Sequence, residues 1–320
     1  MYVKCMYSVA ERIVDNFMTE NIDKDISQEL AGTKRAGSPR PVIANPQVTR
    51  HIMKAFNLRA AKKLGQNFLV DAGIVQGIVD AAEAGPGDRI LEIGPGIGTL
   101  TQGLAESGAE VTAVELDKKL PAVLAETLAG YDNVTIVPGD ILKVNIRELM
   151  GDQPFKVAAN LPYYITTPIL MALLEQHLPI SVLVTMVQKE VALRMVAKPG
   201  SKIYGALSVA VQYYTRPHIA FDVPPRSFIP APEVDSVVIV CDVREKPAVA
   251  VKSEKLFFRV VKAAFGQRRK TMSNAMKGAG FVPEQIAGAF EKCGLDSTRR
   301  GETFSLEEFG ILADALTELA

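Results

Sequence analysis

The chain has 320 residues, of which 48% are hydrophobic and 22% are charged, a composition typical of a globular protein with one large and one smaller domain. Its apolar runs are too short to cross a bilayer, so we expect no membrane association. The three cysteines are far apart, which excludes a disulfide framework and a cysteine-bound metal, and a reducing cytoplasm is therefore expected.

The net charge is zero, but the charges are unevenly distributed. Residues 34–63 hold eight Lys or Arg and no acid, and residues 252–279 hold eight against one acid. The stretch between them, residues 64–251, holds fourteen Lys or Arg against twenty-one acids. Two basic stretches around an acidic middle fit a polyanionic partner, and solvated helix faces are an equally good explanation of the charges alone.

Residues 1–46 are polar, with Gly, Pro and Ser gathered toward residue 46, and we interpret them as a peripheral or poorly ordered extension and linker. From residue 72 onward, short apolar strands alternate with segments of helical period. Strands are predicted over residues 89–94, 110–116, 133–138, 155–160 and 181–187. Helices are predicted over residues 72–84, 99–107, 118–129, 167–176 and 189–197. This alternation predicts an α/β fold, a doubly wound and mostly parallel Rossmann-like sheet with helices on both faces.

Two later strands, over residues 218–224 and 234–243, follow each other without a helix, which predicts an antiparallel hairpin at one edge of the sheet. After residue 252 the pattern is purely helical. We therefore expect an α/β domain over residues 47–250 and a small all-helical domain over residues 251–320.

The segment from Glu92 to Gly98, EIGPGIG, lies between a predicted strand and a predicted helix. Glycines at such a turn let the backbone approach a ligand closely, and the helix N-terminus offers free N–H groups. The third glycine comes one residue too early for the dinucleotide pattern G-x-G-x-x-G. The motif indicates a ligand-binding turn, with a merely tight turn as the alternative.

Two acids follow the next two strands. Glu115 ends its strand at a position where a carboxylate can accept both hydroxyls of a ribose, a device that nicotinamide enzymes share. Asp140 could accept from the amine of a cofactor's adenine, whereas taken alone it would be interpreted as a turn former. As the third feature in an ordered series, Asp140 is better interpreted as functional.

Asn160, Leu161, Pro162 and Tyr163 follow the fourth strand of the series. The amine of adenine is a poor nucleophile, and an Asn oxygen with a nearby backbone carbonyl can hold both of its N–H groups and orient the lone pair. Pro162 stiffens the turn, and the Tyr163 ring can stack on a base turned out of its helix. The alternative is a proline loop with a core tyrosine.

Seven blocks of the sequence, taken in order, resemble the ribosomal RNA adenine dimethyltransferases, and the resemblance extends from about Gln47 to the C-terminus. The blocks cover residues 62–71, 92–101, 114–117, 160–165, 186–209, 224–238 and 264–276. The first 40 residues match nothing in this family, and we assign them no role.

The resemblance implies that the methyl donor is S-adenosylmethionine and that no metal takes part. Gln66 would cover the cofactor, and the residues implied to bind it are Asn67, Leu69, Gly94, Gly96, Glu115, Asp140 and Asn160. The residues implied to act on the target adenine are Asn160, Leu161, Pro162, Tyr163 and Phe228, with Phe228 stacking opposite Tyr163. RNA phosphates would be contacted by Arg259, Lys262, Arg268, Arg269 and Lys270, with Arg194 and Lys198 extending that surface, and for each of these a solvated side chain is the alternative.

The implied activity is dimethylation of the 6-amino groups of two adjacent adenosines near the 3′ end of small-subunit ribosomal RNA. A monomer that acts on this RNA or on an immature small subunit in the cytoplasm is expected. One alternative is a large-subunit RNA methyltransferase of the antibiotic-resistance type. Others are an assembly factor that mainly binds RNA, and a nicotinamide-dependent oxidoreductase, which the glycine spacing disfavours.

Overall fold

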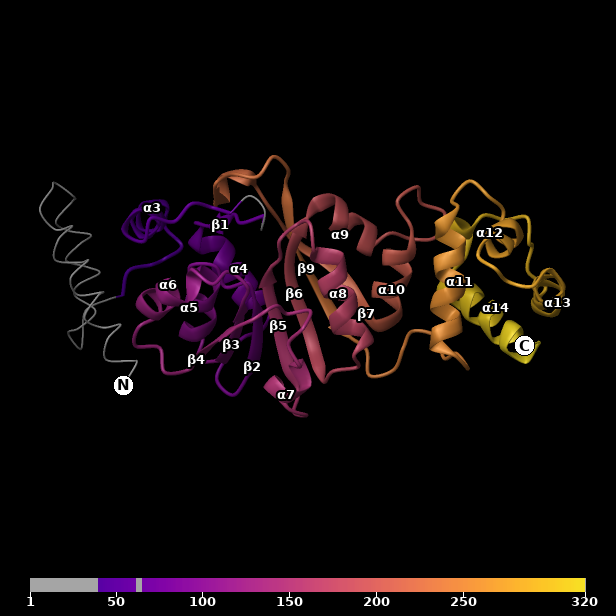
Figure 1. The fold of residues 1–320 in the computed structure, drawn as a ribbon, viewed down its shortest axis with the longest axis horizontal. Coiled ribbons are helices and arrows are strands. Elements are labelled where there is room, and N and C mark those ends of the chain that lie inside the picture. The colour runs from indigo at the N-terminus through magenta and orange to yellow at the C-terminus, as the bar shows by residue number, and fades with distance from the viewer. Residues whose placement is uncertain (1–39, 62–64, 320) are drawn as a thin grey trace, which may run out of the picture.

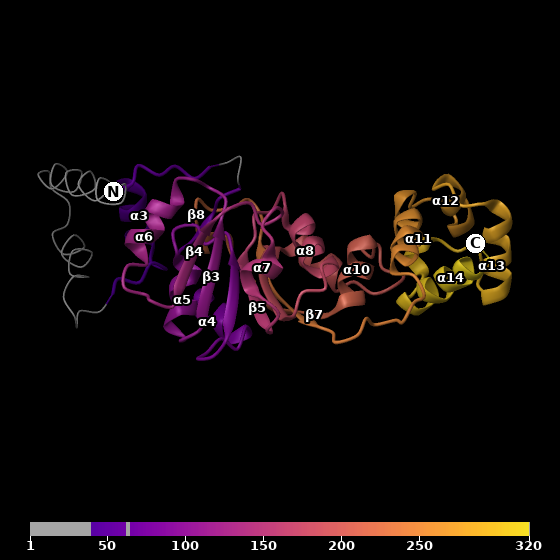
Figure 2. The ribbon, with the colours of Figure 1, turned by 60° about the horizontal axis from the view of Figure 1, so that its bottom comes forward.

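The computed structural model describes residues 40–61 and 65–319, so nearly all of the predicted N-terminal extension lies outside the described residues. Figure 1 shows an α/β region that carries a group of helices at one end, and Figure 2 shows the same arrangement from a second direction. Within the described residues, no helix combines the length and apolar character needed to cross a membrane.

The main sheet has seven strands in the order β4-β3-β2-β5-β6-β9-β7. Their bounds are β2 Arg89–Ile93, β3 Glu110–Glu115, β4 Val134–Pro138, β5 Phe155–Asn160, β6 Ile180–Gln188, β7 Thr215–Val223 and β9 Ser236–Val243. The pairs among β2 to β6 are parallel, whereas β9 is antiparallel to both β6 and β7. The doubly wound sheet and its antiparallel edge hairpin are thus confirmed.

Both faces of the sheet are covered, because successive side chains of a strand point to opposite faces. On β6, Val184 and Met186 join the cluster formed with α4 (Ala72–Ala81) and α5 (Thr99–Glu106). Leu183 and Val187 join the cluster on the other face, formed with α7 (Ile146–Met150), α8 (Thr166–Glu175) and α10 (Ala206–Tyr214). Strands buried on both sides are hydrophobic throughout, which is why β6 is nearly continuous in apolar residues. The helices of the α/β region are α3 Pro46–Ala55, α4 Ala72–Ala81, α5 Thr99–Glu106, α6 Leu120–Thr127, α7 Ile146–Met150, α8 Thr166–Glu175, α9 Lys189–Met195 and α10 Ala206–Tyr214.

Several elements were not predicted from the sequence. They are the helices α3, α7 and α10, the short helix Pro225–Ser227, and a separate ribbon of two two-residue strands, β1 Phe68–Leu69 and β8 Phe228–Ile229. The ribbon pairs Leu69 with Phe228 across a long sequence separation, so local periodicity contains no sign of it. Residues 40–45, assigned above to the linker, also differ from expectation: Ile43 is 2% exposed, and its N–H donates to the side chain of Gln102 at 2.8 Å.

The C-terminal region is helical, as expected. Its elements are α11 Glu254–Gly266, α12 Met272–Gly278, α13 Pro283–Cys293, the short helix Gly301–Thr303 and α14 Leu306–Glu318. Phe257 of α11 stacks on Tyr213 of α10 with ring centroids 4.8 Å apart, and one buried cluster runs from the sheet into these helices. Shared apolar burial therefore holds the helical region against α10.

Candidate functional site

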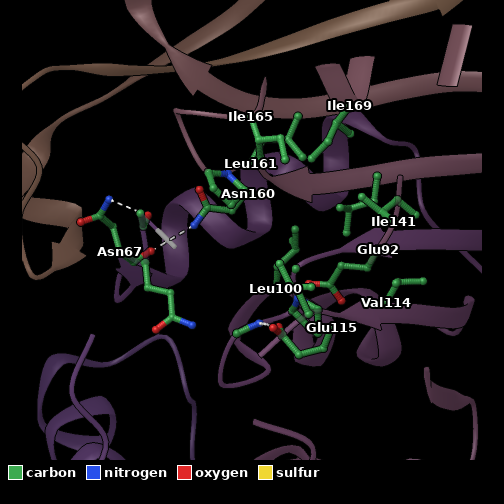
Figure 3. Close-up of a pocket in the computed structure, with 18 of the residues that line it drawn as sticks. Asn67, Glu92, Leu100, Val114, Glu115, Ile141, Asn160, Leu161, Ile165 and Ile169 are labelled. Carbon is green, nitrogen blue, oxygen red and sulfur yellow. Dashed lines mark hydrogen bonds between the residues drawn. The ribbon is translucent and has the colours of Figure 1, made fainter. Parts of the chain in front are cut away.

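A cleft opens where the parallel strands β2, β3, β4 and β5 end, beside the ribbon of β1 and β8. Ligands of doubly wound sheets bind at this edge, because the loops that follow adjacent strands diverge there. Figure 3 shows that its walls come from segments far apart in the sequence. The sequence-predicted residues that line the cleft are Gln66, Asn67, Leu69, Gly94, Gly96, Glu115, Asp140, Asn160, Leu161, Pro162 and Tyr163.

The glycine turn between β2 and α5 forms the floor of the cleft. Gly94, Gly96 and Gly98 have φ values of +70°, +62° and +92°, in the left-handed region that residues with a side chain rarely adopt. A Cβ placed on Gly94 would meet no atom within 4 Å, so the backbone there faces open space. The turn is therefore shaped to bring main-chain atoms against a ligand.

Glu115 is the last residue of β3 and is only 5% exposed, although its carboxylate lies at the cleft. One oxygen accepts from the N–H of Gly96 at 3.2 Å and the other from the N–H of Asp117 at 2.7 Å. Burial raises the pKa of this carboxyl. Each carboxylate oxygen can accept more than one hydrogen bond, so the pair remains available to a diol in the cleft.

Asp140 follows β4, and its contacts are compatible with both roles considered from the sequence, a turn former and a ligand-binding acceptor. Its Oδ1 accepts from the N–H of Leu142 at 3.1 Å, as a turn-forming Asp does, and its Oδ2 lies 3.3 Å from Nζ of Lys143. The residue also lines the cleft. A hydrogen bond to a ligand is compatible with this turn, because the carboxylate has further acceptor positions.

Gln66 and Asn67 bring the N-terminal segment over the cleft. Gln66 donates from Nε2 to Oδ2 of Asp117 at 3.0 Å, next to the carboxylate of Glu115. Asn67 donates from Nδ2 to the carbonyl of Gly65 at 3.2 Å. Leu69, in β1, is buried at the cleft wall. These contacts place the predicted covering segment where it closes one side of the cleft.

Asn160 ends β5, and its side chain points toward Asn67 (Figure 3). Its Nδ2 donates to the backbone carbonyl of Asn67 at 3.2 Å. Among the hydrogen bonds formed within residues 40–61 and 65–319, none reaches its Oδ1. Because the amide donor is held by the protein, the acceptor oxygen is fixed in orientation and available to an N–H group in the cleft.

The three residues after Asn160 hold the loop in place. Leu161 is 1% exposed, and its N–H donates to the carbonyl of Met186 at 3.2 Å. The carbonyl of Pro162 accepts from Oγ1 of Thr166 at 3.1 Å. Tyr163 is half-buried with its hydroxyl 2.6 Å from Oγ of Ser236, and burial raises the pKa of that hydroxyl. The loop is thus anchored to β6, α8 and β9.

Phe228 requires a correction. Its side chain is 3% exposed and belongs to the buried cluster of α4, α5 and the sheet, and it is not among the residues that line the cleft. The loop that carries Phe228 lies beside β1, because β8 pairs Phe228 with Leu69. The ring itself turns into the apolar core, which stabilises it more than exposure at the cleft would. In this structure Phe228 is a core residue, not a stacking surface opposite Tyr163.

Glu92 was quoted in the glycine motif without a role, and the structure adds it to the cleft. It is 1% exposed, and its Oε2 is buried without a hydrogen-bond partner in the described residues. Burial raises the pKa of Glu92 to about 8. The sequence could have identified Glu92 as a candidate site residue, since it is an acid between the apolar residues Leu91 and Ile93 of a strand. A buried acid without a partner is energetically costly, so its presence points to a function.

The five basic residues predicted to contact RNA divide into two groups. Arg268 donates to the carbonyls of Lys202 and Tyr204 at 2.7 and 3.3 Å and pairs with Glu302 at 3.2 Å, so it links the segment after α11 to the segment before α10. The guanidinium of Arg259 lies 4.2 Å from the centre of the Phe281 ring. The second group consists of Lys262, Arg269 and Lys270, which are exposed and form no side-chain hydrogen bond, ion pair or ring contact among the described residues.

The family model described as "Ribosomal RNA adenine dimethylase" matches residues 57–316. A curated relative from Moorella thermoacetica, named "Ribosomal RNA small subunit methyltransferase A", is 52% identical over 283 residues, which cover 86% of this chain and 98% of the relative.

Two solved structures share the fold. A dimethyladenosine transferase from Plasmodium falciparum has a TM-score of 0.66 at 24% identity, covering 79% of this chain and 97% of that one. The 23S rRNA methyltransferase ErmE has a TM-score of 0.62 at 25% identity, covering 78% of this chain and 100% of that one. The α/β sheet with a helical C-terminal region is therefore an arrangement found in RNA methyltransferases.

Proposed function

The chain belongs to the ribosomal RNA adenine dimethylase family, and on this premise we propose that it dimethylates the 6-amino groups of two adjacent adenosines near the 3′ end of small-subunit ribosomal RNA, with S-adenosylmethionine as methyl donor. The observation that supports this most strongly is the Asn160 side chain, whose donor is held by the protein and whose acceptor oxygen is left at the cleft. The family resemblance drawn from the sequence blocks is confirmed.

The residues of the cleft fit the proposed cofactor. Gly94 leaves open space beside the backbone, and Glu115 presents a buried carboxylate that suits two ribose hydroxyls. Glu92 contributes a buried oxygen without a partner in the described residues, which a polar group of a bound molecule would satisfy. When bound, S-adenosylmethionine supplies an electrophilic methyl group. Asp140, Asn67 and Leu69 would complete the walls around it.

The protein's part in the reaction is mainly orientation. Oδ1 of Asn160 would accept one N–H of the target amine, while the bond from Nδ2 to the carbonyl of Asn67 stops the amide from rotating. An amine held in this way directs its lone pair at the methyl group instead of into the ring. Tyr163, fixed by Ser236, would support a base turned out of the RNA, and the exposed Tyr164 lies beside it.

The similarities favour small-subunit over large-subunit RNA as the substrate. The Moorella thermoacetica small-subunit enzyme shares 52% of its residues with this chain, whereas the 23S enzyme ErmE shares 25%. Both have the fold, so the fold does not discriminate between the two substrates. We propose the small-subunit substrate on the identity, and an action in the cytoplasm as a monomer on the RNA or on an immature subunit.

Mapping of methylated adenines tests the proposal. Ribosomal RNA from cells that lack the gene should lose dimethyladenosine at two adjacent positions near the 3′ end of the small-subunit RNA, and a plasmid copy should restore it. Purified protein should methylate the same positions in unmethylated small subunits. Loss of methylation in the large-subunit RNA instead would establish the rival substrate.

Replacing Glu115 with Ala should weaken binding of S-adenosylhomocysteine by about 1.5–3 kcal/mol, or roughly 10- to 150-fold, because two ribose hydroxyls lose a charged acceptor. Isothermal titration calorimetry measures this, with Asp132→Ala, an exposed acid before β4, as the control. Burial raises the pKa of Glu115, so on acidification this carboxylate should become protonated at a higher pH than an exposed Glu. The affinity for S-adenosylhomocysteine should therefore begin to fall at that higher pH. An unchanged dissociation constant in Glu115→Ala would refute the assignment.

We propose that residues 47–250 form the methyltransferase domain and residues 251–320 an RNA-contacting domain. The double variant Arg269→Ala, Lys270→Ala should then reduce the slope of log affinity for RNA against log salt by about 0.7–0.9 for each phosphate that the protein no longer neutralises. Arg268→Ala should instead lower thermal stability, since this residue bonds to Lys202 and Tyr204. Filter binding over a salt series and thermal melting on both variants separate the two roles. If the double variant kept the wild-type salt slope, Arg269 and Lys270 would not contact RNA phosphates, and the proposed RNA-contacting role of residues 251–320 would be contradicted.

A further inference from the structure

The N-terminal basic stretch has so far no role. Within the part of it that the structure describes, Arg50 and Lys54 lie one turn apart on α3, and Arg59 follows the helix. All three side chains are exposed, and residues 40–61 contain no acid. No ion pair among the described residues involves any of the three. Among the described residues, this group of cations therefore has no acidic partner at ion-pair distance.

The buried face of α3 packs against residues that form part of the cleft wall. This face, opposite the cations, is buried through Val48 and Ile52, which belong to one cluster with Phe68 and Ile97, two residues that line the cleft. Asn45 fixes the start of the helix, because its side chain accepts from the N–H groups of Gln47 and Val48. The basic face is thus presented on a rigid helix rather than on a loose segment.

The two groups of exposed cations lie on either side of the cleft. Figures 1 and 2 both place α3 at one end of the molecule and the helical region, which carries Lys262, Arg269 and Lys270, at the other. A strand of RNA whose adenine enters the cleft continues in both directions from that base. Cations on one side only would leave the other half of the strand without counter-charges.

We propose that the exposed face of α3, with Arg50, Lys54 and Arg59, is a second phosphate-binding surface that holds the RNA strand on the side of the cleft away from the helical region. This inference rests on the proposed function. The ring of Phe56, 37% exposed at the end of α3, adds a surface on which an unpaired base can stack. His51, whose pKa is lowered by burial and by Lys54, lies on the same helix and fits a local excess of positive charge.

The test compares two pairs of cations. Arg50 and Lys54 are replaced by Ala, and, as the matched control, Arg216 and Lys246 are replaced by Ala. The control residues are exposed as well. In the strand register, Arg216 of β7 lies opposite Asp242 of β9, and Asp242 lies opposite Val182, near the start of β6. Arg216 is therefore at the edge of the sheet opposite the cleft, which opens where the parallel strands end. Affinity for a small-subunit RNA fragment is measured over a salt series, together with thermal melting.

The Arg50, Lys54 variant should reduce the salt slope by about 0.7 for each single-strand phosphate that is no longer neutralised, and so by up to about 1.4, while methylation at saturating RNA keeps its wild-type rate. The control pair should leave the slope unchanged. Arg50→Gln with Lys54→Gln keeps most of each side chain's length and should give the same slope as the Ala variant, which excludes altered packing as the cause. Equal slopes in the wild type and both α3 variants overturn the inference. Failure of the wild-type protein to methylate the RNA would instead overturn the proposed function.

Discussion

Replacing Asn160 with Ala should slow methyl transfer at saturating RNA and cofactor by about 100-fold, while the dissociation constant for RNA changes little. The structure gives the reason: Nδ2 of Asn160 is held by the carbonyl of Asn67 at 3.2 Å, so the acceptor oxygen has one orientation. Ala removes that acceptor and leaves the amine free to rotate. Single-turnover rates with unmethylated small subunits measure the effect directly.

Asn145→Ala is a suitable control for this variant. Asn145 caps α7 by accepting from the N–H of Glu148, and α7 precedes the start of β5, whereas Asn160 ends that strand. The control should lose some stability and no catalytic rate. Should Asn160→Ala instead lose RNA affinity and keep its rate at saturation, Asn160 would be a binding residue and the orientation mechanism would be wrong.

Replacing Phe228 with Ala should lower the free energy of unfolding by about 3–5 kcal/mol, as expected for a buried aromatic ring. The ring is 3% exposed and packs in the cluster shared by α4, α5 and the sheet. Phe228→Trp should be destabilising too, because a close-packed core does not accept the added volume without strain. Chemical denaturation of both variants, with Phe56→Ala as an exposed-ring control, measures these differences.

The same variants decide between the core role and the stacking role that the sequence predicted. If Phe228 stacked on the target base, Ala would slow methylation without loss of stability, and Trp would restore the rate because a flat ring would suffice. Wild-type stability in Phe228→Ala combined with slow methylation would therefore reinstate the stacking surface and contradict the core role. A combined loss of stability in both variants supports the structure.

The order of the main strands and helices could be predicted from the sequence because each depends on local period. Val184 and Leu183 of β6 alternate between two buried faces, and residues 99–107 repeat at helical spacing. The helix α3 could also have been found, since Asn45 and Pro46 form a start signal before the apolar spacing of Val48 and Ile52. It was not predicted because the residues before it are polar and rich in Gly, Pro and Ser, which favoured a linker.

The sequence by itself also determined which residues could form the site, because glycines, acids and an Asn at the ends of successive parallel strands must converge at one edge of a sheet. Only the tertiary structure decided how each side chain is used. The Asn67 carbonyl orients Asn160, Arg268 is bound within the protein, and Phe228 turns into the core. These outcomes depend on contacts between residues far apart in the chain, where packing and hydrogen bonding compete with exposure, and no local pattern records that competition.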